Sequence, residues 1–260
     1  YELLAQAILD KNGKFDKEDD EKIRFEIASL TSKSLESSSV HTKAVRTYNE
    51  IITLNYDSCF ENAALLNYKK FPPAVTEKIF QLKVDLSNEN LISGCKTKSV
   101  WHAHGAVSEN GDVNSICMWF QTYIQNVAEI KLSLNNFLEK MLFKKNLINS
   151  ENIKTSSWFQ LFFTDDIDII GTELSYSELD VWWILTSRAR LIREGKLKKG
   201  FNRIRYFMLR PYKNEKLSEE KISKIAVSKE KDVILSEIAT APERSDLYNT
   251  EWYYLKAMEL

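Results

Sequence analysis

Cysteine, histidine, proline and glycine are all scarce in this 260-residue chain, with 3, 3, 4 and 7 copies respectively. Three cysteines without a CxxC pair (Cys59, Cys95 and Cys117) exclude a disulfide framework and a four-thiolate zinc site, so we expect no bound metal. Unpaired thiols and the lack of a signal-peptide pattern are typical of a cytoplasmic protein. No apolar run approaches the roughly 20 residues that a membrane-spanning helix needs, so we expect a soluble protein.

Charge of one sign is lacking too, because 36 basic and 37 acidic residues leave a net charge of −1. Binding to nucleic acid or to an anionic membrane needs a basic face, so we expect neither as a direct partner. We interpret the basic cluster Arg188–Lys199 as a solvated helix end. With 43% hydrophobic residues, the chain has the composition of an ordinary globular protein and the length to bury a sizeable core.

Short apolar runs alternate with amphipathic stretches, a pattern that predicts an α/β fold with a mainly parallel sheet and helices on both faces. Apolar and β-branched composition predicts strands at 50–55, 99–103, 167–171 and 203–209. We expect 50–54, 167–170 and 203–208 to lie in one sheet, with the residues after the first two meeting at a common cleft.

Helical periodicity fills most of the remaining chain. It predicts helices at 1–9, 16–30, 40–48, 60–66, 122–147 and 177–192. The tail is mostly helical by pattern, although 233–235 also suits a strand. We therefore expect one α/β domain over 1–260, with helical decoration at 1–48 and 60–98 and a helix-rich tail at 212–260.

Thr53-Leu54-Asn55-Tyr56-Asp57 completes and follows the first expected strand. In open α/β sheets, ligands bind at the carboxyl ends of strands, so these polar residues are placed to contact one. Asparagine offers donors and an acceptor, and aspartate accepts hydrogen bonds from ribose hydroxyls. A structural alternative stays open, because Asn55 and Asp57 are also residue types that cap the start of a helix.

Trp101-His102-Ala103-His104-Gly105 ends the second expected strand and holds two of the three histidines. Alternate strand positions point to one face, so both imidazoles should share it, and we expect only His104 to reach the cleft. An imidazole titrates near neutral pH and suits a general base. A metal pair has no identifiable third ligand, and a buried, hydrogen-bonded histidine is the structural alternative.

Ile169-Ile170-Gly171-Thr172-Glu173-Leu174 again places a glycine after a strand. Gly171 lets the backbone approach a ligand closely, and Thr172 adds a hydroxyl. A plain turn between a strand and a loop explains this stretch equally well.

The order of these three stretches resembles the sirtuin superfamily. Its members place a Thr-x-Asn-x-Asp after one strand, a His-Gly after a later one and a Gly-Thr-Ser-Leu-type turn after a third. Two further stretches, 157–163 and 177–183, look like the bacterial sirtuin-like proteins associated with phage defence. The resemblance covers roughly residues 51 to 209 and implies a Rossmann-like fold that handles NAD.

The resemblance also implies a role for each matching residue. Asn55 and Asp57 would hold the nicotinamide ribose and order the attacking water, and His104 would be the base. The residues that would contact the cofactor are Thr53, Gly105, Gly171 and Thr172, the last two on its adenosine side. Breaking the bond between nicotinamide and ribose develops oxocarbenium character, which amide and carboxylate groups stabilise.

The chain departs from the family in three ways. The family's Gly-Ala-Gly-Ser-type phosphate loop has no match before Ile51, and the chain begins at Tyr1 without Met and in a helical pattern. A trimmed start and a true loss of the loop both stay open. Glu173 replaces a small serine and adds negative charge near the expected phosphates. The four cysteines of the deacetylases' zinc module are missing.

The leading hypothesis is hydrolysis of NAD, as substrate, to nicotinamide and ADP-ribose in a response to phage, with a homo-oligomer or a defence-system protein as partner. The missing phosphate loop favours an alternative, a catalytically silent nucleotide-binding or assembly module. The retained Asn55, Asp57 and His104 favour the enzyme. A protein deacylase is the third hypothesis, and the absent zinc module argues against it.

Overall fold

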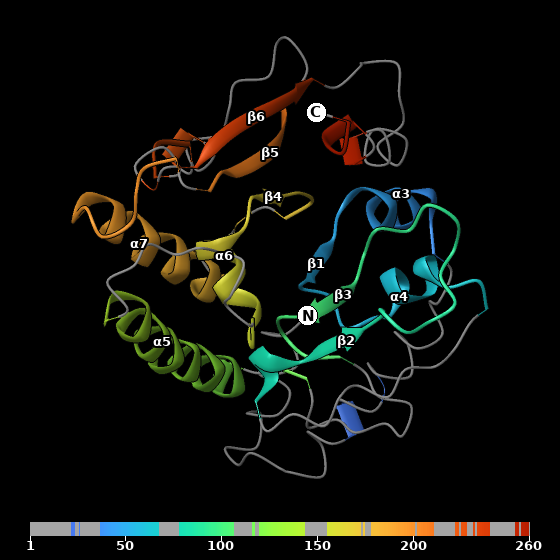
Figure 1. The fold of residues 1–260 in the computed structure, drawn as a ribbon, viewed down its shortest axis with the longest axis horizontal. Helices are drawn as coiled ribbons and strands as arrows, with labels where there is room; N and C mark the ends of the chain where they lie inside the picture. The colour runs from blue at the N-terminus through green and yellow to red at the C-terminus, as the bar shows by residue number, and fades with distance from the viewer. Residues whose placement is uncertain are drawn as a thin grey trace. The chain divides into compact units, whose positions relative to one another are not determined.

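The described part of the chain in the computed structural model is largely continuous from 37 to 67, 78 to 106, 120 to 143 and 155 to 210, apart from 173, 175–177 and 201. Shorter described pieces are 22–23, 26, 116–117, 222–223, 225–227, 231, 233–239, 253–254 and 256–259. The chain divides into two compact units, Tyr1–Glu129 and Ile130–Leu260 (Figure 1). The helix expected at 1–9 lies outside the described residues, and those described within 16–30 are helical.

The first unit is built on a three-stranded mixed sheet in the order β1–β3–β2. Strand β1 (Glu50–Thr53) pairs in parallel with β3 (Ser99–His102), and strand β2 (Lys83–Asp85) pairs antiparallel with β3. Ile51 lies opposite Val100, and both β-branched side chains are buried, which favours the extended conformation. Thr53 lies opposite His102 at the carboxyl ends of the parallel pair.

Two α-helices and one 3-10 turn accompany this sheet between residues 39 and 81. They are α3 (Ser39–Thr47), α4 (Cys59–Ala64) and η2 (Ile79–Gln81). Helices α3 and α4 contact each other. Their apolar side chains join those of the sheet in a core that includes Val45, Ala64, Phe80, Leu86 and Val100.

Helix α5 (Phe120–Phe143) continues the chain from the first unit into the second. Its buried side chains recur mostly every three or four residues, which places them on one face of the helix. They are Asn126, Ile130, Leu134, Phe137 and Leu138. Among the helices that the structure describes, none is both long and apolar enough to cross a membrane.

The second unit contains a parallel sheet in the order β4–β5–β6. Its strands are β4 (Ile167–Ile169), β5 (Ile204–Arg210) and β6 (Ile234–Ala239). The described helices of this unit are η5 (Trp158–Gln160), α6 (Leu161–Thr164) and α7 (Leu179–Arg193). Its core combines aliphatic side chains with large aromatic ones, of which Trp158, Phe159, Phe163 and Phe207 are fully buried.

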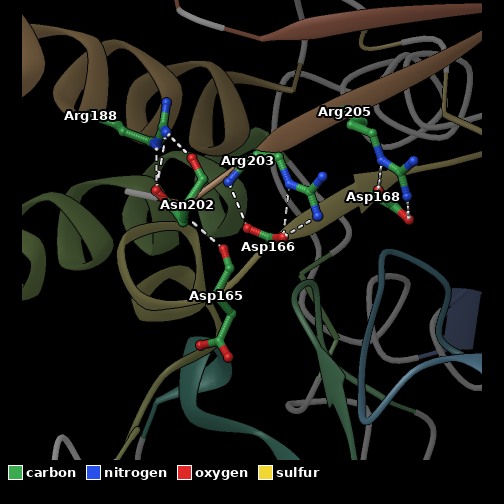
Figure 2. Close-up of polar contacts among 7 residues, drawn as sticks. All are labelled: Asp165, Asp166, Asp168, Arg188, Asn202, Arg203 and Arg205. Atoms are coloured by element: carbon green, nitrogen blue, oxygen red, sulfur yellow. Dashed lines mark hydrogen bonds and ion pairs between the residues drawn. The ribbon is translucent and has the colours of Figure 1, made fainter. Parts of the chain in front are cut away.

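A buried arginine ties α7 to the loop before β5. Arg188 is 0% exposed, and its Nη2 donates to the carbonyl oxygen of Asn202 at 2.7 Å and to its Oδ1 at 3.0 Å (Figure 2). The Asn202 amide donates in turn to the carbonyls of Phe162 at 2.9 Å and Asp165 at 2.7 Å. The sequence predicted a solvated helix end at Arg188–Lys199, and for Arg188 this prediction is wrong. Arg190 and Arg193 are exposed, as that prediction requires. The hydrogen-bonded network is what allows this charge to be buried.

Two arginine–aspartate pairs link β4 to β5 (Figure 2). Arg205 and Asp168 are partners in the strand register, and their side chains form two hydrogen bonds of 2.7 Å. Arg203 Nη2 lies 2.8 Å from Asp166 Oδ2 just before the strands begin, in a more exposed pair. Opposite charges directly across a strand pair favour one register, so these pairs align β4 with β5.

The architecture is mixed α/β, but the described strands form two small sheets, whereas the sequence predicted one sheet for 50–54, 167–170 and 203–208. The apolar pattern that marks a strand carries no information about its partner, and β1 and β4 are edge strands of different sheets. Strand β2 lies within 60–98, a stretch that was expected to be helical. The sequence did not reveal this strand because Lys-Val-Asp is too short to show an alternating pattern. The strand alternative for 233–235 is confirmed as β6.

Candidate functional site

The expected motif residues of the first unit begin where β1 ends. Thr53 is buried, and its Oγ1 accepts a hydrogen bond from the Asn55 backbone N–H at 3.1 Å. Its carbonyl oxygen accepts from Ala103 N–H at 3.0 Å, which extends the contact with the β3 segment by one residue. The loop therefore leaves the sheet in a fixed turn, and the Asn55 side chain on it is exposed.

The second loop turns sharply after β3. Gly105 N–H donates to the His102 carbonyl at 3.2 Å, and Gly105 has φ of 97°, a conformation that disfavours any residue with a Cβ. His104 sits in this turn, half-buried, with its ring edge-on to Tyr123 at a centroid distance of 5.6 Å. Because β3 ends at His102, the alternation expected to put both histidines on one face does not reach His104.

A short segment around Cys117 joins the two loops. The Tyr56 hydroxyl donates to the Cys117 carbonyl at 3.0 Å, and Cys117 N–H donates to the His104 carbonyl at 2.8 Å. Gly105 also forms a β-bridge with Ile116. The structure thus brings together five of the expected residues at the carboxyl edge of β1 and β3: Thr53, Asn55, Asp57, His104 and Gly105.

Asp57 makes a structural contact at the start of α4, where the N-cap residue is its neighbour Ser58. Its Oδ1 accepts a hydrogen bond from the Cys59 backbone N–H at 3.0 Å, at the first turn of α4. Burial raises the pKa of the Cys59 thiol to about 12, with further contributions from Asp57 and Glu61. Cys59 therefore stays protonated at neutral pH and is not a thiolate nucleophile at this edge.

Glu61 and His102 form a buried pair that the sequence did not reveal. His102 Nε2 lies 2.7 Å from Glu61 Oε1, and both side chains are 1% exposed. His102 Nδ1 lies 3.4 Å from the Asn55 carbonyl oxygen. Burial lowers the pKa of His102, but the hydrogen bond and charge of Glu61, with smaller effects of the Asn55 carbonyl and Asp57, outweigh it and leave this pKa raised.

The turn after β4 lies in the second unit and carries Gly171 and Thr172. Gly171 has φ of 76°, and a Cβ added to it would lie 2.1 Å from Tyr254 Oη, so tyrosine contact and backbone conformation both require glycine. Gly171 N–H donates to Tyr253 Oη at 3.2 Å, and that hydroxyl donates to the Phe207 carbonyl at 2.5 Å. Burial raises the pKa of Tyr253 to about 12, so the hydroxyl keeps the proton that it donates.

Thr172 is also held by its own neighbours. Its Oγ1 lies 2.9 and 3.0 Å from the two carboxylate oxygens of Glu178, to which it donates, and it accepts from Leu174 N–H at 3.1 Å. The Thr172 carbonyl accepts from the Tyr206 hydroxyl at 3.2 Å. Glu173 lies outside the described residues. That Gly171 and Thr172 meet Asn55 in one cleft stays a prediction.

Cys59, Cys95 and Cys117 are free thiols. Within the described ranges, no group of three or more His, Cys, Asp or Glu side chains could hold a metal ion. Neither a protein-family model, nor a curated protein, nor a solved structure matches this chain.

Proposed function

We propose that this chain is a sirtuin-like domain that hydrolyses NAD to nicotinamide and ADP-ribose. The observation that carries the proposal is the parallel pairing of β1 with β3. Neighbouring parallel strands end at the same edge of a sheet, so the loops that carry Asn55, Asp57 and His104 leave it side by side. Such an edge is where open α/β folds bind nucleotides.

In the proposed reaction, the bond between ribose C1′ and the nicotinamide nitrogen breaks, and its electron pair goes to nicotinamide. A water oxygen attacks C1′, and the water proton passes to the imidazole of His104, which acts as the general base. Asn55 and Asp57 hold the ribose and stabilise the positive charge that develops on it. The exposed side chain of Asn55 and the half-buried one of His104 are compatible with contact to a substrate.

The remaining parts of the proposal rest on the sirtuin resemblance. Thr53 and Gly105 shape the cofactor edge, and Gly171 and Thr172 contact the adenosine side. The fold that goes with it is Rossmann-like and mainly parallel, supported by three parallel pairings (β1–β3, β4–β5 and β5–β6) against one antiparallel pairing among the described strands. A cytoplasmic role in phage defence, with a homo-oligomer or a partner protein, completes it.

A catalytically silent nucleotide-binding or assembly module is the second candidate, and three contacts favour it. Asp57 accepts a hydrogen bond from the Cys59 N–H at the start of α4, Thr172 donates to Glu178, and the Tyr254 ring occupies the space beside the Gly171 Cα. In this alternative the motif residues serve the fold rather than a reaction.

The test is product analysis of purified protein, with its N-terminus verified by mass spectrometry, incubated with NAD. We expect equimolar nicotinamide and ADP-ribose from the wild type. His104→Ala should lower turnover by about 10²–10⁴-fold, the usual loss for a positioned general base. The exposed control Lys199→Ala should leave it unchanged. Intact NAD after incubation with folded wild type would favour the silent module, and full cleavage by folded His104→Ala would remove its assigned role.

A further inference from the structure

The Glu61–His102 pair belongs to the edge that carries Asn55, yet neither side chain has a role in the proposed reaction. His102 is the last residue of β3, and Glu61 lies on α4, which starts directly after the Asn55 loop. The pair therefore connects the sheet, the helix and the loop between them through a single imidazole ring. Both side chains are 1% exposed, so neither can reach a substrate at the surface directly.

The hydrogen-bonding pattern of this ring is determined by its two partners. The Asn55 carbonyl can only accept a hydrogen bond, so Nδ1 of His102 must carry a proton to donate across the 3.4 Å contact. Nε2 then either donates to the Glu61 carboxylate or accepts from its protonated form across 2.7 Å. In both cases one proton is shared between Nε2 and Oε1, and the pair has no net charge.

The contacts of the pair are limited to each other and to the Asn55 backbone among the hydrogen bonds that the structure describes for Glu61 and His102. Glu61 Oε2 is buried without a hydrogen-bond partner among the described residues, so His102 is the group that compensates this carboxylate. The same ring contacts the backbone of Asn55 and not its side chain. The direction of the Asn55 side-chain amide therefore depends on how the backbone of the loop is held. The other side of the loop is anchored independently, through Thr53 Oγ1 and the Asn55 N–H.

From these contacts we infer that Glu61 and His102 form a positioning pair that fixes the Asn55 backbone, and thereby orients the Asn55 amide toward the scissile ribose. The inference rests on the proposed NAD hydrolysis. Thr53 holds the N–H of Asn55 and His102 holds its carbonyl, so the peptide groups on both sides of this residue are restrained. A misplacement of about 1 Å at a reacting group can lower a rate about 10²-fold, so such restraint is worth that factor.

The experiment compares Glu61→Gln with Glu61→Ala in steady-state NAD hydrolysis, at a temperature where unfolding curves show both to be folded. Glutamine keeps a hydrogen-bonding partner for Nε2, because its amide N–H can donate to an unprotonated Nε2 while Nδ1 keeps its proton and the pair stays uncharged, and this variant should retain kcat to within a few-fold. Alanine removes it and should lower kcat about 10²-fold with little change in KM. Glu139→Ala, on the exposed face of α5, is the matched control and should behave as the wild type.

Each outcome has a distinct meaning. Equal loss in Glu61→Gln and Glu61→Ala would overturn the inference, because it would make the carboxylate itself a proton carrier. Unchanged kcat in both would overturn it in favour of a purely structural pair. Amide hydrogen exchange of peptides covering 54–58 supplies a readout that does not need turnover: Glu61→Ala should speed exchange there, and Glu61→Gln should not.

A wild type that leaves NAD intact would overturn the proposed function, and the catalytic meaning of the pair with it. In that case faster exchange at 54–58 in Glu61→Ala would still establish that the pair holds the loop. Unchanged exchange in Glu61→Ala would overturn the positioning of Asn55 whether or not NAD is cleaved. The failure of one claim is thereby distinguishable from the failure of the other.

Discussion

The pKa values of His41 and His102 are shifted in opposite directions because the surroundings of the two rings differ. Burial lowers the pKa of His41, and Asp57 offsets this only in part. Burial also lowers the pKa of His102, but Glu61, the Asn55 carbonyl and Asp57 outweigh it and leave this pKa raised. His102 therefore adds stability that is complete below the unfolded pKa of about 6.5 and is lost as pH rises through its folded pKa. His41 adds stability that is present above about 6.5 and is lost as pH falls through its folded pKa.

We accordingly expect the free energy of unfolding to decline as pH rises above about 6.5, through the folded pKa of His102. In His102→Gln the curve should lie lower at neutral pH, and the part of the alkaline decline that comes from His102 should be absent. His41→Gln is the control, since it should alter the acid side and leave the alkaline decline in place. Urea unfolding at a series of pH values measures both. An alkaline decline of unchanged slope in His102→Gln would contradict the pairing with Glu61.

At this scale the sequence predicts the polar residues that follow a strand and misses the buried partners that support them. Asn55, Asp57 and His104 stand out because their types and places differ from the apolar runs beside them. Glu61 lies 41 residues from His102, and Arg188 lies 14 from Asn202. A charged residue in an amphipathic helix is normally solvent-facing, so only the tertiary contact identifies these two as buried.

Among the secondary-structure elements, most strands are predictable, whereas their pairing is not. β1, β3, β4 and β5 coincide with expected strands because each is a run of apolar, often β-branched residues. The same pattern cannot distinguish one sheet from two, since hydrogen-bonding partners are chosen by backbone geometry and by neighbours distant in sequence. The Lys-Val-Asp segment of β2 is a strand because it pairs antiparallel with β3. No local sequence pattern indicates this pairing.

The anchoring of α7 to the β5 loop gives a prediction for the second unit. Arg188→Met should destabilise the protein by about 3 kcal/mol, because it leaves the buried oxygens of Asn202 without their donor. Arg190→Met, two residues along the same helix and exposed, should change stability by less than about 0.5 kcal/mol. Chemical denaturation measures both. Equal stability of the two variants would show that the network of Figure 2 does not hold the helix.

At the scale of the whole molecule, the residues of the expected site belong to two compact units. Thr53, Asn55, Asp57, His104 and Gly105 belong to the first unit, and Gly171 and Thr172 belong to the second. Local pattern together with the sirtuin resemblance pointed to these seven residues, each of which follows or ends a strand. The contacts that hold each turn, from Cys117 in one unit and Tyr253 in the other, come from segments far along the chain and were beyond sequence reasoning.

The chemistry proposed for the whole molecule requires no metal. Purified protein should therefore contain less than stoichiometric zinc by elemental analysis, and EDTA should leave both NAD cleavage and the unfolding temperature unchanged. The basis is the spacing of Cys59, Cys95 and Cys117, which lacks the pairs of a closed tetrahedral site. Zinc bound at one ion per chain, or loss of activity with EDTA that zinc restores, would contradict this prediction.

The central claim is that NAD is cleaved at the edge where β1 and β3 end, and the rate of nicotinamide release by Asn55→Ala tests it most directly. Because the Asn55 amide is exposed and has no part in the core, the variant should unfold as cooperatively as the wild type. Its turnover of NAD should be lower by about 10²–10³-fold, the loss typical of one electrostatic contact in the transition state. A well-folded Asn55→Ala that releases nicotinamide at the wild-type rate would contradict the account.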